Sequence, residues 1–329
     1  MKTDSEPFRG IVYVATGDES WSKMCLTSIA SLRDRGYQDY FFIITDQTDA
    51  PWPQDKTIIH SVPKDPSTYS SRHWKTQAGL LSPFSKSIYL DCDILAIAEL
   101  KDIWREVKAD GIGFTSDMYP TLHDALTKEY RQTLDQANQY VFSVREHDYT
   151  ANLATRDRPY YNGGLVSWSK NEESIRFFSS WHNEWKRFSQ RDQFALARAL
   201  YTSGVTAYRL PGEFNFNAVW SVTLAKAVNR DIKFVHFLGK DQKRAIWSFT
   251  KQIEVFNAID ASTQKKLEAI FRANIFKDRD VIFKLWPLII ALPPKVGFRV
   301  LLFVGLSILS IISSKMPSKF RWERSRIAG

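Results

Sequence analysis

The chain has 329 residues, 44% hydrophobic and 25% charged, which suits one large domain with an appendage or two small domains. Its two cysteines, Cys25 and Cys92, exclude a disulfide-rich scaffold and fit a reducing compartment. The formal net charge is +9, but residues 281–329 hold eight basic side chains against one acidic, so the body is nearly neutral. This distribution argues against a nucleic-acid ligand and indicates a membrane surface.

Apolar segments of strand length alternate with helical patterns along the first half of the chain. The strands are expected at Gly10–Thr16, Tyr40–Thr45, Thr57–Val62, Ile88–Leu90 and Gly111–Ser116. Helices are expected from Trp21 to Leu32, from His73 until Pro83 stops the helix, and from about Thr121 to Val141. The second half is more mixed. This alternation predicts an α/β fold with a largely parallel sheet, in which ligands bind at the carboxyl ends of strands.

Two carboxylates end the strand in "KSIYLDCDILAI", with Cys92 between Asp91 and Asp93. In an extended chain Tyr89, Asp91 and Asp93 point to one side. Two like charges at a buried strand end repel each other, so a metal ion, a basic side chain or water should lie there. A second D-x-D, Asp278 to Asp280, is flanked by basic residues without a buried strand, and it is interpreted as a solvated charge cluster.

Three interpretations of Asp91 and Asp93 compete. One is a strand-end turn with solvated aspartates. Another is a haloacid-dehalogenase-type phosphatase, but Leu95 stands where that motif has Thr or Val and no later acidic cluster appears. The third is a divalent-metal site that holds a diphosphate.

The order of motifs favours the third interpretation. "VYVATGDESW", "YLDCDIL", "YYNGGLVSW", "RDQFAL", "LPGEFNFN" and "FVHFLGK" follow one another between Gly10 and Trp247. Together they resemble the glycosyltransferases of family 8, which include glycogenin-like and lipo-oligosaccharide galactosyltransferase enzymes. The resemblance implies a GT-A fold, Rossmann-like, with a mixed, mostly parallel sheet flanked by helices. It also implies retaining transfer of a sugar from a nucleotide diphosphate, a UDP-hexose, to a hydroxyl of a glycolipid or cell-surface glycan.

The resemblance also implies a metal site. Asp91, Asp93 and His236 would bind Mn²⁺, with Mg²⁺ as an alternative, and oxygen ligands with one imidazole suit such an ion. His236 alone would be taken for a core histidine in an apolar strand. The residues after it, up to Gly239, match the family's H-[FY]-x-G pattern and favour the ligand role.

Further residues are assigned by the resemblance to the donor. The nucleotide base would contact Ala15, Thr16, Gly17 and Asp18, although Asp18 is equally expected as a helix cap. Lys75 stands where the family commonly has an Arg near the nucleotide, with Arg72 as a second candidate. The sugar pocket would be lined by Asn162, Gly163 and Gly164. Asp192 and Gln193 would lie beside the donor sugar, with Asp192 the one carboxylate to test for a covalent role and a helix-start residue as its alternative.

The segment after His236 departs from the family pattern. Gln242 stands where a Lys is expected, no Pro follows, and Trp247 is displaced. Gly239, Lys240 and Lys243 are assigned to the diphosphate, with a solvated basic turn as the alternative. Two other classes stay open. A sugar-phosphate nucleotidyltransferase would need a Gly-rich basic loop that "ATGDESW" lacks, and a non-catalytic membrane-bound interaction protein needs no site.

The C-terminal segment indicates a membrane-associating helical tail. Residues 1–280 are expected to form the catalytic domain and residues 281–329 the tail. Val300 to Ser314 carries no charge, but as a helix it reaches roughly 22 Å against about 30 Å of hydrocarbon. A monotopic anchor at the cytoplasmic face is therefore favoured over a single span or a tail folded onto the core. "MKTDSEPFRG" has no apolar stretch, so no signal peptide is expected.

Overall fold

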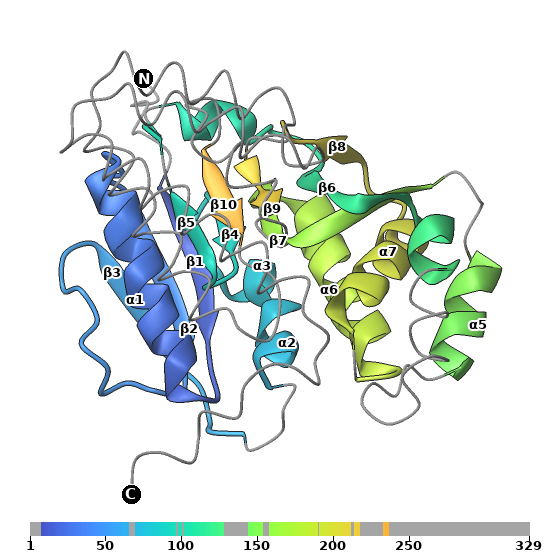
Figure 1. Cartoon of the computed structure of the whole chain (residues 1–329), viewed down its shortest axis with the longest axis horizontal. Helices are drawn as coiled ribbons and strands as arrows, with labels where there is room; N and C mark the ends of the chain where they lie inside the picture. Colours follow the sequence, from blue (N-terminus) through green and yellow to red (C-terminus); the bar gives the residue numbers. More distant parts are fainter. Residues whose placement is uncertain are drawn as a thin grey trace, which may run out of the picture. The chain divides into compact units, whose positions relative to one another are not determined.

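The computed structural model describes nine segments of the chain, residues 8–65, 70–96, 98–100, 102–127, 144–153, 158–189, 191–211, 214–217 and 233–236 (Figure 1). The chain divides into two compact units, Met1–Asn215 and Phe216–Gly329. The predicted sites at Gly239, Lys240 and Lys243, the second D-x-D and the whole tail lie outside the described residues, as does most of the second unit.

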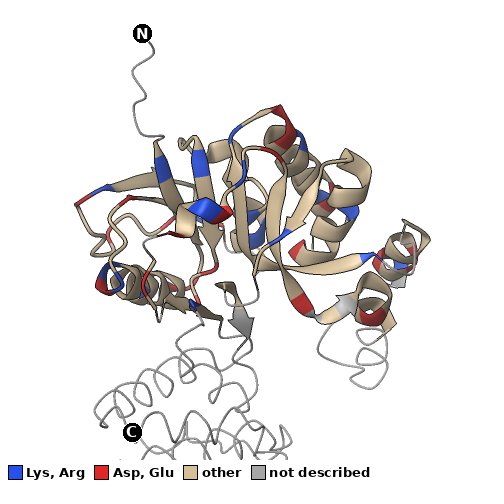
Figure 2. Cartoon of the chain, turned by 90° about the horizontal axis from the view of Figure 1, so that it is seen from above, with Lys and Arg blue, Asp and Glu red and all other residues tan. Residues whose placement is uncertain are grey.

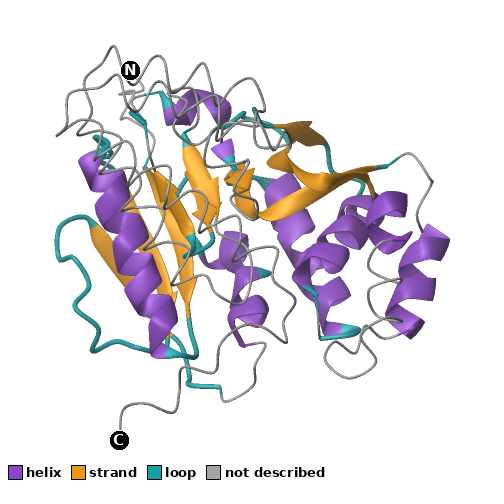
Figure 3. Ribbon diagram, in the orientation of Figure 1, coloured by secondary structure: helices purple, strands orange, loops and turns teal. Residues whose placement is uncertain are grey.

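The first unit is built on a seven-stranded sheet of order β3-β2-β1-β4-β7-β6-β8 (Figure 3). The strands are β1 (Arg9–Ala15), β2 (Tyr40–Thr45), β3 (Thr57–Ser61), β4 (Lys86–Leu90), β6 (Ile112–Thr121), β7 (Pro159–Ser169) and β8 (Ala207–Arg209). Within this sheet only β7 runs against the other strands. The short β5 (Ile94–Ala96) follows β4, and the second unit contains the parallel pair β9 (Phe216–Asn217) and β10 (Phe234–His236).

Helices cover both faces of the sheet because side chains alternate along β1. Val12 and Val14 belong to a core that includes residues of α3 (Ala78–Leu81), α6 (Glu172–Lys186) and α7 (Asp192–Ser203). Tyr13 points to the other face, where its hydroxyl lies 2.7 Å from Ser28 Oγ of α1 (Glu19–Asp34). The mixed, mostly parallel sheet with helices on both faces confirms the predicted α/β class.

Two predicted helices differ in detail. The expected helix ending at Pro83 is two short helices, α2 (Ser70–Lys75) and α3, interrupted at Thr76 and Gln77. Of the helix expected from Thr121 to Val141, the described part is helical over 122–127. The remaining elements are the 3₁₀ helix η1 (Ile103–Glu106) and α5 (Val144–Leu153). No helix within the described segments is both long and apolar enough to span a bilayer.

Basic and acidic side chains are interspersed over the described elements (Figure 2), in agreement with a nearly neutral body. A buried cluster of charged side chains links three helices. Arg198 of α7 is 1% exposed and bonds Glu184 Oε2 of α6 at 3.1 Å and Glu146 Oε1 of α5 at 3.0 Å. Burial raises the pKa of Glu146, while the Arg198 charge opposes that rise. The cluster ties three helices together, and α7 opens with Asp192 and Gln193.

Replacing Arg198 should destabilise the fold strongly, because Arg198→Leu removes the buried cation that Glu146 and Glu184 share. We expect the free energy of unfolding to fall by about 3–5 kcal/mol, measured by urea denaturation. Replacing all three charged residues together with apolar side chains of similar volume should restore most of that loss. A loss below about 0.5 kcal/mol for Arg198→Leu, the range of an ordinary surface substitution, would contradict this role.

Candidate functional site

The predicted site residues of the first unit gather at one edge of its large sheet. The carboxyl ends of β1, β2, β4 and β6 meet there, since these strands are mutually parallel. The antiparallel β7 contributes its amino-terminal part instead, with Leu165 opposite Leu90 of β4 and Asn162 opposite Thr115 of β6. The direction of β7 therefore brings the Asn-Gly-Gly segment beside the carboxylates that end β4.

A basic side chain lies at the strand end that carries Asp91. Lys75, the last residue of α2, places its ammonium 2.9 and 3.1 Å from the two oxygens of Asp91. The Tyr89 hydroxyl donates to Asp91 Oδ1 at 2.7 Å, and the Asp91 amide donates to the Gly164 carbonyl at 2.8 Å. The pKa of Tyr89 is raised well above its usual value by burial and by Asp91, so the phenol stays protonated and donates. These contacts with Lys75, Tyr89 and Gly164 fix the position of Asp91, which remains partly exposed.

The same ammonium also binds Asp192, the first residue of α7. Lys75 Nζ lies 2.9 Å from Asp192 Oδ2, and Arg72 Nε lies 3.5 Å from Asp192 Oδ1. Burial alone would lower the pKa of Lys75, but Asp192 and Asp91 outweigh it and raise that pKa above its ordinary value. Burial would raise the pKa of Asp192, but Lys75 and Arg72 lower it. At neutral pH Lys75 and Asp192 are therefore both charged.

Gly163 passes directly beside this ion pair. A Cβ on Gly163 would lie 3.7 Å from both Lys75 Nζ and Asp192 Oδ2, and 3.5 Å from Leu196. A larger side chain would therefore meet the ion pair. The φ of Gly163 is not in the left-handed region, and a Cβ alone would make ordinary contacts here, so the backbone itself does not require glycine.

A second polar network continues along the edge. Asp117 Oδ2 accepts from Asn162 Nδ2 at 3.0 Å and from Gln193 Nε2 at 2.8 Å. Asn162 Oδ1 accepts from the Gly164 amide and from Asn215 Nδ2, each at 2.8 Å. Sequence reasoning missed Asp117 and Asn215. The signal for Asp117 was present, because it directly follows a predicted strand as Asp91 does, and Asn215 stands in the "LPGEFNFN" motif.

Residues at the end of β2 hydrogen-bond the backbone at the end of β1. Gly17 has φ +94°, and its amide donates to both oxygens of Asp46, each at 3.1 Å. The Ala15 carbonyl accepts from Thr45 Oγ1 at 2.7 Å, and Thr16 is buried. Asp18 accepts from the Ser20 amide at 2.8 Å and caps α1, which confirms the capping role expected as its alternative. Asp46 was not singled out by the sequence.

Within the described segments, one group of three acidic, His or Cys side chains could hold a metal ion, namely Asp91, Asp93 and His236. Each offers one ligand atom, and these atoms lie within 4.8 Å of one another. Asp93 is 3% exposed and His236 is 2% exposed. Two carboxylate oxygens and an imidazole nitrogen fit a Mn²⁺-like ion.

The charges at this edge also favour a divalent cation. The carboxylates described at this edge, Asp18, Asp46, Asp91, Asp93, Asp117 and Asp192, outnumber the two cationic side chains described there, Lys75 and Arg72. Such an excess of negative charge attracts a cation.

No protein-family model matches the chain, and no curated protein matches its sequence. Solved structures that match include the apo structure of the bifunctional glycosyltransferase WbbM, at 12% identity and TM-score 0.48, over 73% of this chain and 47% of WbbM. This chain thus spans about half the length of WbbM. The galactosyltransferase LgtC, in complex with donor and acceptor sugar analogs, matches at 14% identity and TM-score 0.44, over 74% of this chain and 95% of LgtC. Both are glycosyltransferases.

The shared ammonium gives a prediction about pH. Lys75→Met should lower the free energy of unfolding by about 3 kcal/mol at pH 7, because Asp91 and Asp192 lose the buried cation that they share. Lys75 lowers the pKa of Asp192, so its stabilisation is present above the ordinary aspartate pKa of about 3.9 and lost as the pH falls below it. The difference between wild type and variant should therefore shrink below about pH 4, as urea titrations at several pH values would show.

Lys75→Arg is the matched control, since it keeps a cation between the two carboxylates. It should retain most of the stability at pH 7. A Lys75→Met penalty that stays constant from pH 7 to pH 3 would contradict the ion-pair account and indicate lost packing instead.

Proposed function

We propose that this protein is a metal-dependent glycosyltransferase that moves a hexose from a UDP-sugar to an acceptor hydroxyl. The observation that carries the proposal is the composition of one sheet edge. It combines a carboxylate–imidazole group, Asp91, Asp93 and His236, with a buried cation, Lys75, and with amide side chains suited to sugar hydroxyls. A diphosphate, a metal and a sugar are the ligands that this combination fits.

The three ligands would hold Mn²⁺, with Mg²⁺ as a weaker substitute. When bound, such an ion supplies a Lewis acid that stabilises the charge developing on the departing diphosphate. Neighbouring residues fix the position of the ligand Asp91. Lys75 and Tyr89 fix the Asp91 carboxylate in position, and the Asp91 amide is anchored to the Gly164 carbonyl. Gly239, Lys240 and Lys243 are proposed to contact the diphosphate on the strength of their motif alone.

Asp192 is better suited to an electrostatic role than to nucleophilic attack on the anomeric carbon. One of its oxygens contacts Lys75 and the other contacts Arg72, and these cations lower its pKa. A carboxylate in that state is a weak nucleophile. We therefore propose that Asp192 positions Lys75, and that transfer proceeds with retention by attack on the face from which the diphosphate leaves.

The nucleotide is proposed to bind at the end of β1. Gly17 allows close approach of the backbone, and Asp46 holds its amide in place. Ala15 and Thr16 would offer backbone groups to the base, while the Asp18 carboxylate is occupied as a helix cap. Asn162, Gly163 and Gly164 would line the sugar pocket.

The acceptor is proposed to be a glycolipid or a cell-surface glycan at the cytoplasmic face of a membrane. The support is the sequence of residues 281–329, which combines an uncharged stretch with eight basic side chains and Trp286 and Trp322. Such a segment can insert into one leaflet while its basic groups meet anionic head groups. The enzyme would then work where a lipid-linked acceptor presents its hydroxyl.

The decisive experiment is hydrolysis of UDP-, GDP- and ADP-hexoses by the full chain with Mn²⁺. We expect a UDP-hexose to be cleaved, with the anomeric configuration retained in the first sugar product detected by NMR. Asp91→Ala, Asp93→Ala and His236→Ala should each lower activity by at least about 100-fold, because each removes one ligand of a single ion.

Asp278→Ala and Asp280→Ala are the matched controls, as a second D-x-D without a buried strand. Both should leave activity unchanged. If that pair proves essential and Asp91 dispensable, the site has been misassigned. Tight UDP binding without any hydrolysis or transfer would instead indicate a non-catalytic binding protein.

Removing residues 281–329 tests the membrane proposal. The truncated chain should hydrolyse its UDP-hexose at the wild-type rate but lose binding to vesicles that contain anionic lipid, because the basic and apolar groups are gone. Co-sedimentation with such vesicles measures this directly. Equal sedimentation of the truncated and full chains would place the membrane contact elsewhere.

A further inference from the structure

The carboxylate of Asp117 accepts two side-chain amides through one oxygen. Gln193 Nε2 donates to Asp117 Oδ2 at 2.8 Å, and Asn162 Nδ2 donates to the same atom at 3.0 Å. Asp117 also accepts the Tyr119 amide through Oδ1, at 3.3 Å, which orients the carboxylate from its own strand. The sequence motifs did not point to Asp117, and the function proposed above gives it no role.

The two amides depend on Asp117 to different degrees. The Asn162 carbonyl oxygen is fixed independently, because it accepts from the Gly164 amide and from Asn215. Gln193 is different. Within the described segments, its one side-chain hydrogen bond is the bond to Asp117, and the residue is only half buried.

Rotation of a side-chain amide by 180° exchanges the positions of its NH₂ donor and its carbonyl acceptor. A carboxylate only accepts hydrogen bonds, so the group of Gln193 that faces Asp117 must be the NH₂. The carbonyl oxygen of Gln193 then points away from Asp117. Asp192, which directly precedes Gln193 in the chain, binds Lys75 at the proposed donor site.

We propose that Asp117 is a positioning residue that fixes the side-chain amide of Gln193, so that Gln193 presents its carbonyl oxygen to the donor sugar. This inference rests on the proposed function. A carbonyl oxygen is the negative end of a dipole, and it stabilises an electron-poor anomeric carbon as the diphosphate leaves. An amide turned the other way would present a donor and oppose that charge.

The test is a double-mutant cycle in the full chain, with Mn²⁺ and the UDP-hexose that the wild type hydrolyses as probes. Asp117→Ala should lower kcat by about 10- to 100-fold, while the Kd values for Mn²⁺ and UDP change less than about twofold. Asp117→Asn, whose carbonyl oxygen can still accept both amides, should recover most of that kcat. In a Gln193→Ala background, Asp117→Ala should cost less than about twofold further.

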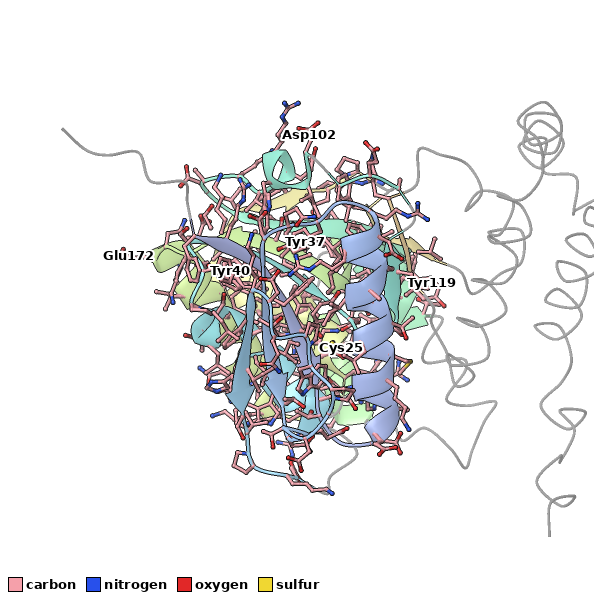
Figure 4. All side chains as sticks on the ribbon, turned by 90° about the vertical axis from the view of Figure 1, so that its left-hand side faces the viewer. Cys25, Tyr37, Tyr40, Asp102, Tyr119 and Glu172 are labelled. Carbon is pink, nitrogen blue, oxygen red and sulfur yellow. The ribbon has the colours of Figure 1, made fainter. Side chains whose placement is uncertain are left out.

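Asp102→Ala removes an exposed carboxylate on the surface (Figure 4) and should leave kcat unchanged. Thermal unfolding checks the fold of each variant, and Asp117→Leu, close in shape to the aspartate, replaces Asp117→Ala if the latter does not fold. Equal costs of the Asp117 change in both backgrounds, or a large rise in the Kd for Mn²⁺, would overturn the inference. A wild-type chain that binds neither Mn²⁺ nor UDP would instead overturn the proposed function beneath it.

Discussion

The site depends on one ammonium group placed between two carboxylates. Lys75 lies 2.9 Å from Asp91 and 2.9 Å from Asp192, and thereby joins the end of α2 to the end of β4 and the start of α7. Without that cation the two carboxylates would repel each other in a partly buried setting. Lys75 instead holds both carboxylates in fixed places, and Asp91 is one of the three side chains that could hold a metal ion.

The topology of the sheet explains how a short stretch of chain comes to lie beside the carboxylates at this edge. Parallel strands end at one edge, and only the antiparallel β7 brings a strand beginning there. Its Asn162 to Gly164 segment therefore lies between the carboxylate ends of β4 and β6. Gly163 lies beside the ion pair, and Asn162 donates to Asp117 while it accepts from the Gly164 amide, so it links the two networks.

Sequence predicted the layers and the strand ends, because strand alternation and the D-x-D context are local patterns. The D-x-D alone left a metal, a basic side chain and water open at Asp91, and it could not show that Lys75 contacts Asp91 and Asp192 at once, because these residues come from separate parts of the chain. The interruption between α2 and α3 was not predicted, because the sequence up to Pro83 fitted one continuous helix. Asp46, which follows β2, and Asp117, which follows the predicted strand but lies within β6, went unnoticed, because single carboxylates at such positions are too common to select without knowing their partners.

The central claim is that Asp91, Asp93 and His236 hold one divalent cation beside the Lys75 ion pair. Anomalous X-ray scattering at the manganese edge, from crystals of the full chain grown with Mn²⁺ and UDP, measures this most directly. The account predicts one strong peak within about 2.0–2.5 Å of a carboxylate oxygen of each aspartate and of an imidazole nitrogen, with diphosphate oxygens completing the shell. A peak elsewhere, or UDP bound at this edge without any manganese peak, would contradict it.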